Sequence, residues 1–177
     1  VEIECIYYAS MPYTSQEALN KVKELARIIS RYQGRIKLHI VPFTQTQLEI
    51  YRNCDEQYAI TIMRRMMYRI AQQIAEKNSC LAIVNGESIG QVASQTMTAL
   101  GTTDSVTEMP VFRPLIGFDK EEIVRVSKKI GTYETSFLPY EDCCTIFVAK
   151  HPVTKPSAKV IRRHEEFLKE EIDLMVQ

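Results

Sequence analysis

The sequence predicts an α/β fold, a mostly parallel β-sheet with helices on both faces. Strand-like and helix-like segments alternate along most of the 177 residues, as they do in chains built from βαβ units. Runs such as residues 81–84 are also apolar on both faces, which is typical of strands that helices cover on both sides. The length suits one domain with its own core.

Residues 3–9 form the first predicted strand, because they are predominantly apolar. A helix follows. It begins at the T-x-x-E capping pattern of Thr14 and Glu17 and ends at Gly34. Apolar side chains recur at helical spacing inside it, at Ala18, Leu19, Val22, Leu25, Ala26 and Ile29. Residues 36–43 form the second predicted strand.

A short helix and a long helix are expected next. Thr44 and Gln47 repeat the capping pattern at the start of the short helix. The long helix runs from about Gln57 to Lys77. Its apolar stripe recurs with the helical period of about 3.6 residues and consists of Ala59, Ile62, Met63, Met66, Met67, Ile70 and Ile74.

Two further strands are predicted at 80–85 and 110–116, with 102–109 as a loop between elements. Ligands of parallel sheets bind beyond the carboxyl ends of the strands. The segments that follow three of the predicted strands are therefore expected to share one rim.

Two helices complete the predicted fold. Asp119 and Glu122 cap the first of them, which closes at Gly131. The last helix runs from about residue 157 to residue 176.

Composition excludes several classes of function. Lys and Arg together number 22, as do Asp and Glu, so net charge gives no case for nucleic-acid or membrane binding. No apolar run reaches ~18 residues, so no membrane partner is expected. Walker-type and G-x-G-x-x-G loops are missing, and three scattered histidines without C-x-x-C argue against a metal site. Five irregularly spaced cysteines indicate reduced thiols in the cytoplasm.

The stretch NGESIGQVASQT, residues 85–96, has two interpretations. It can be a helix start whose small residues allow close packing. It can also be a binding segment, in which Gly86 admits a planar ligand, Gln91 or Gln95 supplies an amide, and free N–H groups hold an anion.

The stretch MRRMMYR lies on the long helix. Its methionines fall on the apolar stripe, where gap-filling packing is their expected role. Arg64 lies at the edge of the stripe and Arg69 on its other side. The Arg64 side chain can therefore reach a phosphate of a ligand at the rim or simply extend into solvent.

The stretch PYEDCC is the most reactive in the chain. Cys143 and Cys144 follow a proline-containing loop and are expected to be exposed. Glu141 and Asp142 would raise the thiol pKa values, and the basic residues that follow would offset them. The alternative is one buried and one idle cysteine.

Taken together, seven stretches resemble the PP-loop ATP-pyrophosphatase domain of the tRNA 4-thiouridine synthetases, also called thiamine-biosynthesis sulfurtransferases. In family order they are HIVPFT, MRRMM, NGESIGQVASQT, RPLIGFDKEEI, IGTYETS, PYEDCC and TKP. They cover nearly the whole chain, and they are specific jointly, although each is weak alone.

The resemblance implies roles for seven residues. Tyr7 and Tyr8 match the strand end against which the adenine lies. The matched nucleotide-contacting positions are Arg64, Gly86 and Gln95. Cys143 matches the catalytic cysteine, and its neighbour Cys144 leaves that assignment open between the two.

The implied reaction has two steps, with ATP and Mg²⁺ as cofactors and tRNA as a partner. ATP adenylates the C4 oxygen of a tRNA uridine, expected at position eight, and a persulfide sulfur then displaces AMP to give 4-thiouridine. A cysteine desulfurase or another persulfide donor supplies the sulfur. A related sulfur transfer would serve thiamine thiazole synthesis.

The chain also departs from the family pattern. The SGGxDS phosphate loop is absent, and so are THUMP-type RNA-binding and rhodanese domains. Residues 1–177 are therefore expected to be one partial domain, incomplete at its N-terminal end, inactive alone and able to form a homodimer through an exposed sheet edge. Two alternatives stay open: a non-catalytic nucleotide- or RNA-binding remnant, and a PP-loop amidotransferase, which PYEDCC disfavours because ammonia attack needs no cysteine.

Overall fold

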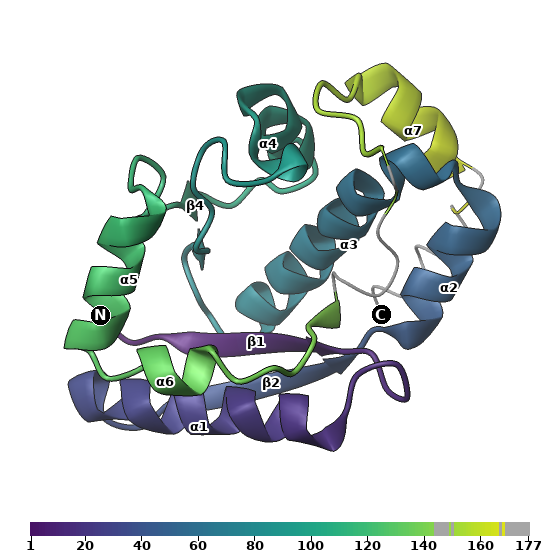
Figure 1. Ribbon diagram of the computed structural model, residues 1–177. Helices are drawn as coiled ribbons and strands as arrows, with labels where there is room; N and C mark the ends of the chain where they lie inside the picture. Colours follow the sequence, from purple (N-terminus) through teal and green to yellow (C-terminus); the bar gives the residue numbers. More distant parts are fainter. Residues whose placement is uncertain (144–148, 150, 167, 169–177) are drawn as a thin grey trace. The chain divides into compact units, whose positions relative to one another are not determined.

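The computed structural model describes residues 1–143, 149, 151–166 and 168 (Figure 1). Contacts divide the chain into two compact units. The first comprises Val1–Thr44 and the described part of Asp119–Ile146, and the second comprises Gln45–Phe118 and the described part of Phe147–Gln177. None of the helices among these described residues has the length and apolar character that a membrane span requires.

A two-stranded parallel sheet forms the centre of the first unit. β1 (Glu4–Ala9) pairs with β2 (Lys37–Pro42), and Glu4 lies opposite Lys37. α1 (Gln16–Gln33) connects the two strands and packs against β1 (Figure 1). Both predicted strands, their parallel direction and the helix between them are confirmed.

The ends of α1 differ in how well the sequence predicted them. Gly34 closes the helix as expected, with a φ of 86° that favours glycine. The predicted cap at Thr14 is wrong, because the hydroxyl of Ser15 accepts the N–H of Ala18 at 3.2 Å. Thr14 belongs to the preceding turn, where its N–H donates to the carbonyl of Ser10 at 3.0 Å.

Two helices complete the first unit. α5 (Lys120–Lys129) begins with the predicted capping box, since Asp119 and Glu122 each accept the other's backbone N–H, at 2.8 and 2.9 Å. α6 (Tyr133–Ser136) was not predicted, and it packs against both α1 and α5.

Helix α3 (Glu56–Lys77) is the longest element of the second unit and confirms the predicted long helix. Asp55 caps it, and α2 (Thr44–Asn53) precedes it. Most of the predicted apolar stripe is buried, namely Ala59, Ile62, Met63, Met66 and Ile70. Met67 and Ile74 are only half-buried.

The second unit has its own parallel pair, β3 (Ile83–Val84) and β4 (Val111–Phe112). The direction is as predicted, but both strands are shorter than expected. Cys80 cannot join the first of them, because its N–H donates to the Ala75 carbonyl at 2.8 Å and finishes the end of α3. Among the described residues, the strands thus pair as two sheets of two strands each.

The chain between β3 and β4 contains a helix that the sequence reading placed wrongly. Residues 85–92 are not helical, and a short 3₁₀ turn, η1 (Ala93–Gln95), precedes α4 (Met97–Asp104). The hydroxyl of Thr96 caps α4 by accepting the N–H of Ala99 at 3.2 Å. The helix-start interpretation of residues 85–96 therefore holds only at Thr96, the cap of α4, and not directly after the strand. The expected loop over residues 102–104 is wrong, because these residues belong to α4.

Helix α7 (Ala158–Glu166) packs against α3 through a buried ion cluster. Glu165 accepts two hydrogen bonds from Arg65, both at 2.8 Å, and two from Arg69, at 2.8 and 3.1 Å. Arg65 also donates to the carbonyl of Thr102 at 2.5 Å. Most of the predicted helix beyond Glu166 lies outside the described residues.

Candidate functional site

The sequence-predicted site residues fall into both units. Tyr7, Tyr8 and Cys143 lie in the first unit, whereas the second unit carries Arg64, Gly86 and Gln95. Cys144 lies outside the described residues. Each unit therefore contributes a separate group of side chains.

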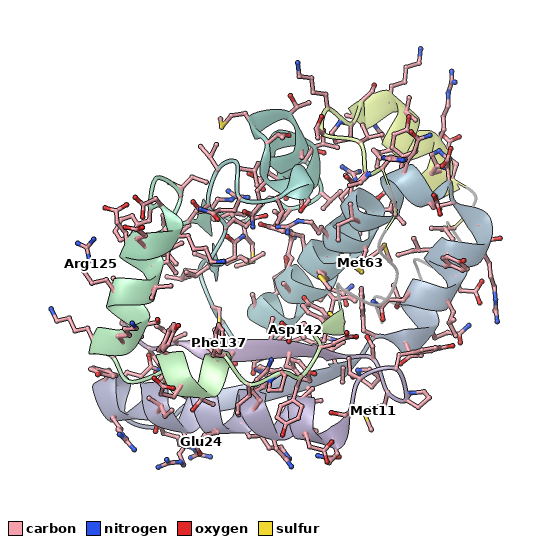
Figure 2. The ribbon with its side chains drawn as sticks, viewed as in Figure 1. Met11, Glu24, Met63, Arg125, Phe137 and Asp142 are labelled. Carbon is pink, nitrogen blue, oxygen red and sulfur yellow. The ribbon has the colours of Figure 1, made fainter. Side chains whose placement is uncertain are left out.

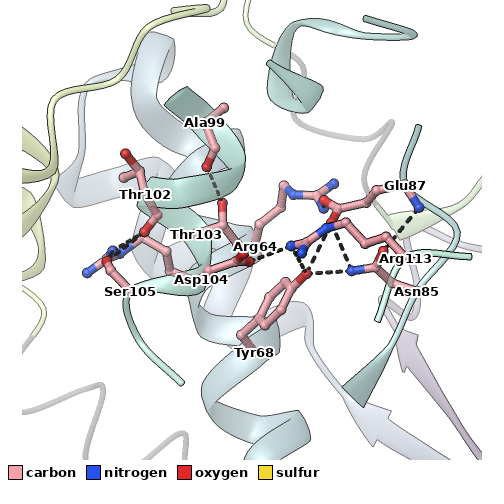
Figure 3. Close-up of polar contacts among 11 residues, drawn as sticks. Arg64, Tyr68, Asn85, Glu87, Ala99, Thr102, Thr103, Asp104, Ser105 and Arg113 are labelled. Carbon is pink, nitrogen blue, oxygen red and sulfur yellow. Dashed lines mark hydrogen bonds and ion pairs between the residues drawn. The ribbon is translucent and has the colours of Figure 1, made fainter. Parts of the chain in front are cut away.

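In the second unit, Arg64 belongs to a polar cluster, here called the Glu87 cluster. It consists of Arg64, Tyr68, Asn85, Glu87, Asp104 and Arg113 (Figure 3). Helix α3 contributes its two members at i, i+4 spacing, which places them on one helix face. The segment after β3 provides two more, the last residue of α4 another, and the residue after β4 the last. Four parts of the second unit thus contribute side chains to the cluster, and all of them except Asp104 of α4 contact Glu87 or belong to its own segment.

Glu87 is the centre of this cluster, with only 4% of its surface exposed. Its Oε2 accepts hydrogen bonds from Arg113 Nε at 2.6 Å, Asn85 Nδ2 at 2.8 Å and the Tyr68 hydroxyl at 3.1 Å. Its Oε1 forms an ion pair with Arg64. A buried carboxylate is costly unless it is paired and hydrogen-bonded. Here Oε2 accepts the hydrogen bonds, whereas Oε1 has the Arg64 ion pair and accepts no hydrogen bond from the described residues.

Arg113 links Glu87 to the end of α4. Its guanidinium also pairs with Asp104 and donates to the Tyr68 hydroxyl at 3.1 Å. Burial raises the pKa of Tyr68, while the positive charge of Arg113 opposes that shift. Tyr68 is therefore a neutral donor at physiological pH. Two guanidinium groups face two carboxylates, so the formal charges within the Glu87 cluster balance.

Gly86 leaves one face of the chain open beside this cluster. A Cβ added there would meet only Leu115 Cδ1, at the ordinary contact distance of 4.0 Å. The position also does not have the positive φ that requires glycine. Neither packing within the protein nor backbone conformation explains the glycine, which is consistent with close approach of a ligand.

Gln95 and Gln91 differ in how they are placed. Gln91 is exposed, whereas Gln95 lies on η1 with a buried side-chain oxygen that accepts no hydrogen bond from the described residues. Buried polar atoms nearly always have partners. An unsatisfied amide oxygen therefore singles out Gln95 as the better candidate of the two.

In the first unit, the segment before Cys143 is held by Lys21, a residue that the sequence reading missed. Lys21 projects from α1 and is 8% exposed, and its ammonium donates to the carbonyl of Tyr140 at 2.7 Å. It also lies 3.8 Å from a carboxylate oxygen of Asp142, a residue labelled in Figure 2. Lys21 lies three residues after Ala18 in the apolar stripe of α1, and this position could have predicted that its side chain is buried.

Cys143 is buried, with 8% of its surface exposed, so the expectation of an exposed thiol is wrong. Tyr7 lies nearby and is also buried. Burial raises the pKa of the Tyr7 hydroxyl, Thr14 lowers it, and the nearby charges of Asp142 and Cys143 raise it. The Tyr7 hydroxyl therefore lies within electrostatic range of the Cys143 segment.

Tyr8 lies on the other face of β1, as alternation along a strand requires. Its ring packs edge-to-face on Phe43, with the ring centroids 5.1 Å apart. The two neighbouring tyrosine side chains thus have different surroundings within the first unit.

Other cysteines are less suited to nucleophilic chemistry. Burial, with a smaller contribution from the Glu165 charge, raises the pKa of the Cys54 thiol to about 11. Burial also raises the pKa of Cys5. Both are protonated at neutral pH, and the thiolate is the reactive form.

Metal binding finds little support in the part of the chain that the structure describes. Those residues contain no group of three or more His, Cys, Asp or Glu side chains that could hold a metal ion. A Mg²⁺ ion held chiefly by protein ligands does not fit this donor set.

Comparisons with known proteins identify relatives over the whole chain. The profile of the family described as thiamine biosynthesis protein (ThiI) matches residues 1–170. A probable tRNA sulfurtransferase of Lachnoclostridium phytofermentans is 56% identical over 177 residues, and one of Acetivibrio thermocellus is 57% identical over 168 residues. These alignments cover 100% and 95% of this chain but only 45% and 43% of the two relatives.

A solved structure is similar over nearly the whole chain as well. It is a crystal structure of a 4-thiouridine synthetase–RNA complex with bound ATP, with a TM-score of 0.93 and 41% sequence identity. The match covers 99% of this chain and 46% of that one.

Proposed function

The chain belongs to the thiamine biosynthesis protein (ThiI) family, and on this premise we propose that it is the catalytic part of an ATP-dependent tRNA sulfurtransferase. In this proposal, residues 1–177 are a partial PP-loop ATP-pyrophosphatase domain. The observation that carries it is the close similarity to a 4-thiouridine synthetase that holds both RNA and ATP. Because the chain spans less than half of its relatives, the complete activity would require further segments.

The first step would be adenylation of the tRNA uridine, expected at position eight. The C4 oxygen attacks the α-phosphorus of ATP, forms an O–P bond and releases pyrophosphate. Arg64 would bind a phosphate, Gly86 would let the nucleotide approach the backbone, and Gln95 would offer its amide. Tyr7 and Tyr8 would contribute the strand end for the adenine. Mg²⁺ would arrive with the ATP phosphates, and no step is assigned to it.

The second step would exchange oxygen for sulfur. The terminal sulfur of a donor persulfide, such as that of a cysteine desulfurase, attacks C4 and AMP leaves. The Cys143 thiolate then attacks the donor's inner sulfur, so that a Cys143–donor disulfide forms and 4-thiouridine is released. Alternatively, Cys143 carries the persulfide itself. Cys144 remains the second candidate for this role, and a cytoplasmic location would suit the free thiols that the described cysteines have.

Arg64→Ala tests the proposed nucleotide site. In the intact gene product, we expect the Kd for ATP to rise about 10- to 100-fold, because a hydrogen bond to a charged phosphate is lost. The melting temperature should fall only slightly, since Glu87 keeps the donors Arg113, Tyr68 and Asn85. Calorimetric titration with ATP and a thermal melt measure the two quantities.

Arg69→Ala provides the matched control on the same helix. Arg69 pairs with Glu165, which keeps its two hydrogen bonds from Arg65, so the loss of Arg69 should lower the melting temperature about as little as Arg64→Ala does and leave ATP affinity unchanged. Equal losses of ATP affinity in the two variants would contradict a phosphate contact by Arg64 and return it to a packing role.

Gly86→Ala tests the open face beside the Glu87 cluster. The added methyl group meets no protein atom closer than 4.0 Å, so the melting temperature should be unchanged. The Kd for ATP should rise at least about tenfold if the nucleotide lies against this glycine. Gly101→Ala, which also meets nothing within 4 Å, is the control. Equal ATP affinity in both variants would remove Gly86 from the site.

A further inference from the structure

We propose that Glu87 is a positioning residue, which orients the Arg64 guanidinium toward the nucleotide, and that Arg113 holds the Glu87 carboxylate in place. This inference rests on the proposed role of Arg64. It concerns two residues, Glu87 and Arg113, that the sequence resemblance did not assign to the site.

The two carboxylate oxygens of Glu87 have different contacts. All three strong donors from Arg113, Asn85 and Tyr68 converge on Oε2, at 2.6 to 3.1 Å. Oε1 faces Arg64 (Figure 3). The three donors anchor the carboxylate through Oε2, so Oε1 is held at a fixed place beside the Arg64 guanidinium, with which it forms an ion pair.

Arg64 needs such an acceptor. Its long side chain lies at the edge of the α3 stripe and is 19% exposed, so its guanidinium end must be oriented before it can meet a ligand. Fixing a long side chain of this kind costs rotamer entropy. Pairing with a rigid carboxylate fixes the guanidinium before the ligand arrives, which is how preorganisation raises affinity.

Adjacency supports the same conclusion. Glu87 directly follows Gly86 in the sequence, and its N–H donates to the side-chain oxygen of Asn85 at 3.1 Å. The carboxylate is thus tied to the same short segment that leaves its backbone open. The ion pair with Glu87 thus holds Arg64 beside that segment.

Simple electrostatics predicts the opposite effect, and this makes the proposal testable. A carboxylate close to a phosphate-binding arginine repels the phosphate. If Glu87 acted only through its charge, Glu87→Gln would tighten ATP binding. If Glu87 positions Arg64, the same substitution should weaken ATP binding, because the amide is a poorer partner for a guanidinium.

The experiment is a double-mutant cycle in the intact gene product, with calorimetric titration of Mg-ATP. We expect Glu87→Gln to raise the Kd about tenfold, the size typical when a group that orients a binding side chain is lost. In the Arg64→Ala background, Glu87→Gln should change the Kd no further. Glu49→Gln, which removes a carboxylate paired with Arg52 on α2, should leave the Kd unchanged.

Arg64→Lys gives a second test that does not disturb the buried carboxylate. Lysine keeps the charge but cannot make the planar pair with Glu87, so ATP affinity should fall nearly as far as in Arg64→Ala. Wild-type affinity in Arg64→Lys would overturn the positioning role. Tighter ATP binding by Glu87→Gln would also overturn it. The same would follow if Glu87→Gln weakened ATP binding equally in the wild-type and Arg64→Ala backgrounds. No effect of Arg64→Ala would instead refute the proposed nucleotide contact itself.

Discussion

Replacing Cys143 with serine in the intact gene product is expected to abolish 4-thiouridine formation and to leave adenylation of the tRNA intact. The thiol is needed only after AMP is attached, when it releases the sulfur from its donor, and a serine hydroxyl cannot form a disulfide. Thiouridine absorbance of the product tRNA and pyrophosphate release from ATP measure the two steps separately.

Two cysteine controls accompany this variant. Cys54→Ser should keep full activity, because burial holds the Cys54 pKa at about 11 and its thiolate is scarce. Cys144→Ser should keep most activity. Repeated turnover of thiouridine by the Cys143→Ser variant, or the reverse pattern for the two neighbouring cysteines, would show that the assignment is wrong.

The local surroundings of Cys143 are compatible with this role for reasons that the sequence did not reveal. Asp142 would disfavour a neighbouring thiolate, but the buried ammonium of Lys21 lies 3.8 Å from its carboxylate. The sequence reading assigned the compensating charge to the basic run that follows. Within the first unit, a cation beside this segment comes from α1, more than 100 positions earlier, and the role of the basic run stays a prediction.

Local signals in the sequence were reliable where one element determines the outcome. The 3.6-residue stripe of α3 placed Arg64 at a stripe edge, and the structure finds it there, half-buried. The capping box of Asp119 and Glu122 depends on four consecutive residues, and it formed as predicted. Gly34 ended α1 as expected.

Local sequence signals did not predict the burial of side chains whose partners come from distant parts of the chain. Glu87 lies inside a stretch that drew notice for its glycines, yet its burial depends on Arg113, which is 26 positions away. The burial of Cys143 likewise depends on packing that the chain around it does not encode. Charged residues that partners bury cannot be recognised before the partners are known.

Glu165→Gln is expected to destabilise the protein by about 3–5 kcal/mol at neutral pH, the usual cost of breaking a buried ion pair. Glu165 is 6% exposed and accepts four hydrogen bonds from Arg65 and Arg69. The variant leaves both guanidinium groups without their counter-charge. Urea unfolding followed by circular dichroism measures the difference in the free energy of unfolding.

The same difference should depend on pH in a defined direction. Burial alone would raise the pKa of Glu165, but hydrogen bonds and charges from Arg65 and Arg69 outweigh it and hold the pKa below its ordinary value of 4.5. A carboxylate whose pKa is lowered in the folded state contributes its full stabilisation above pH 4.5. That contribution is lost as the pH falls through the folded-state pKa. The gap between wild type and Glu165→Gln should therefore be widest near neutral pH and narrow below pH 4.5.

The exposed pair of Glu24 and Arg27 on α1 is the control, since Glu24→Gln should change stability little at any pH. A gap that stayed constant down to acid pH would show that Glu165 acts through packing and not through its charge.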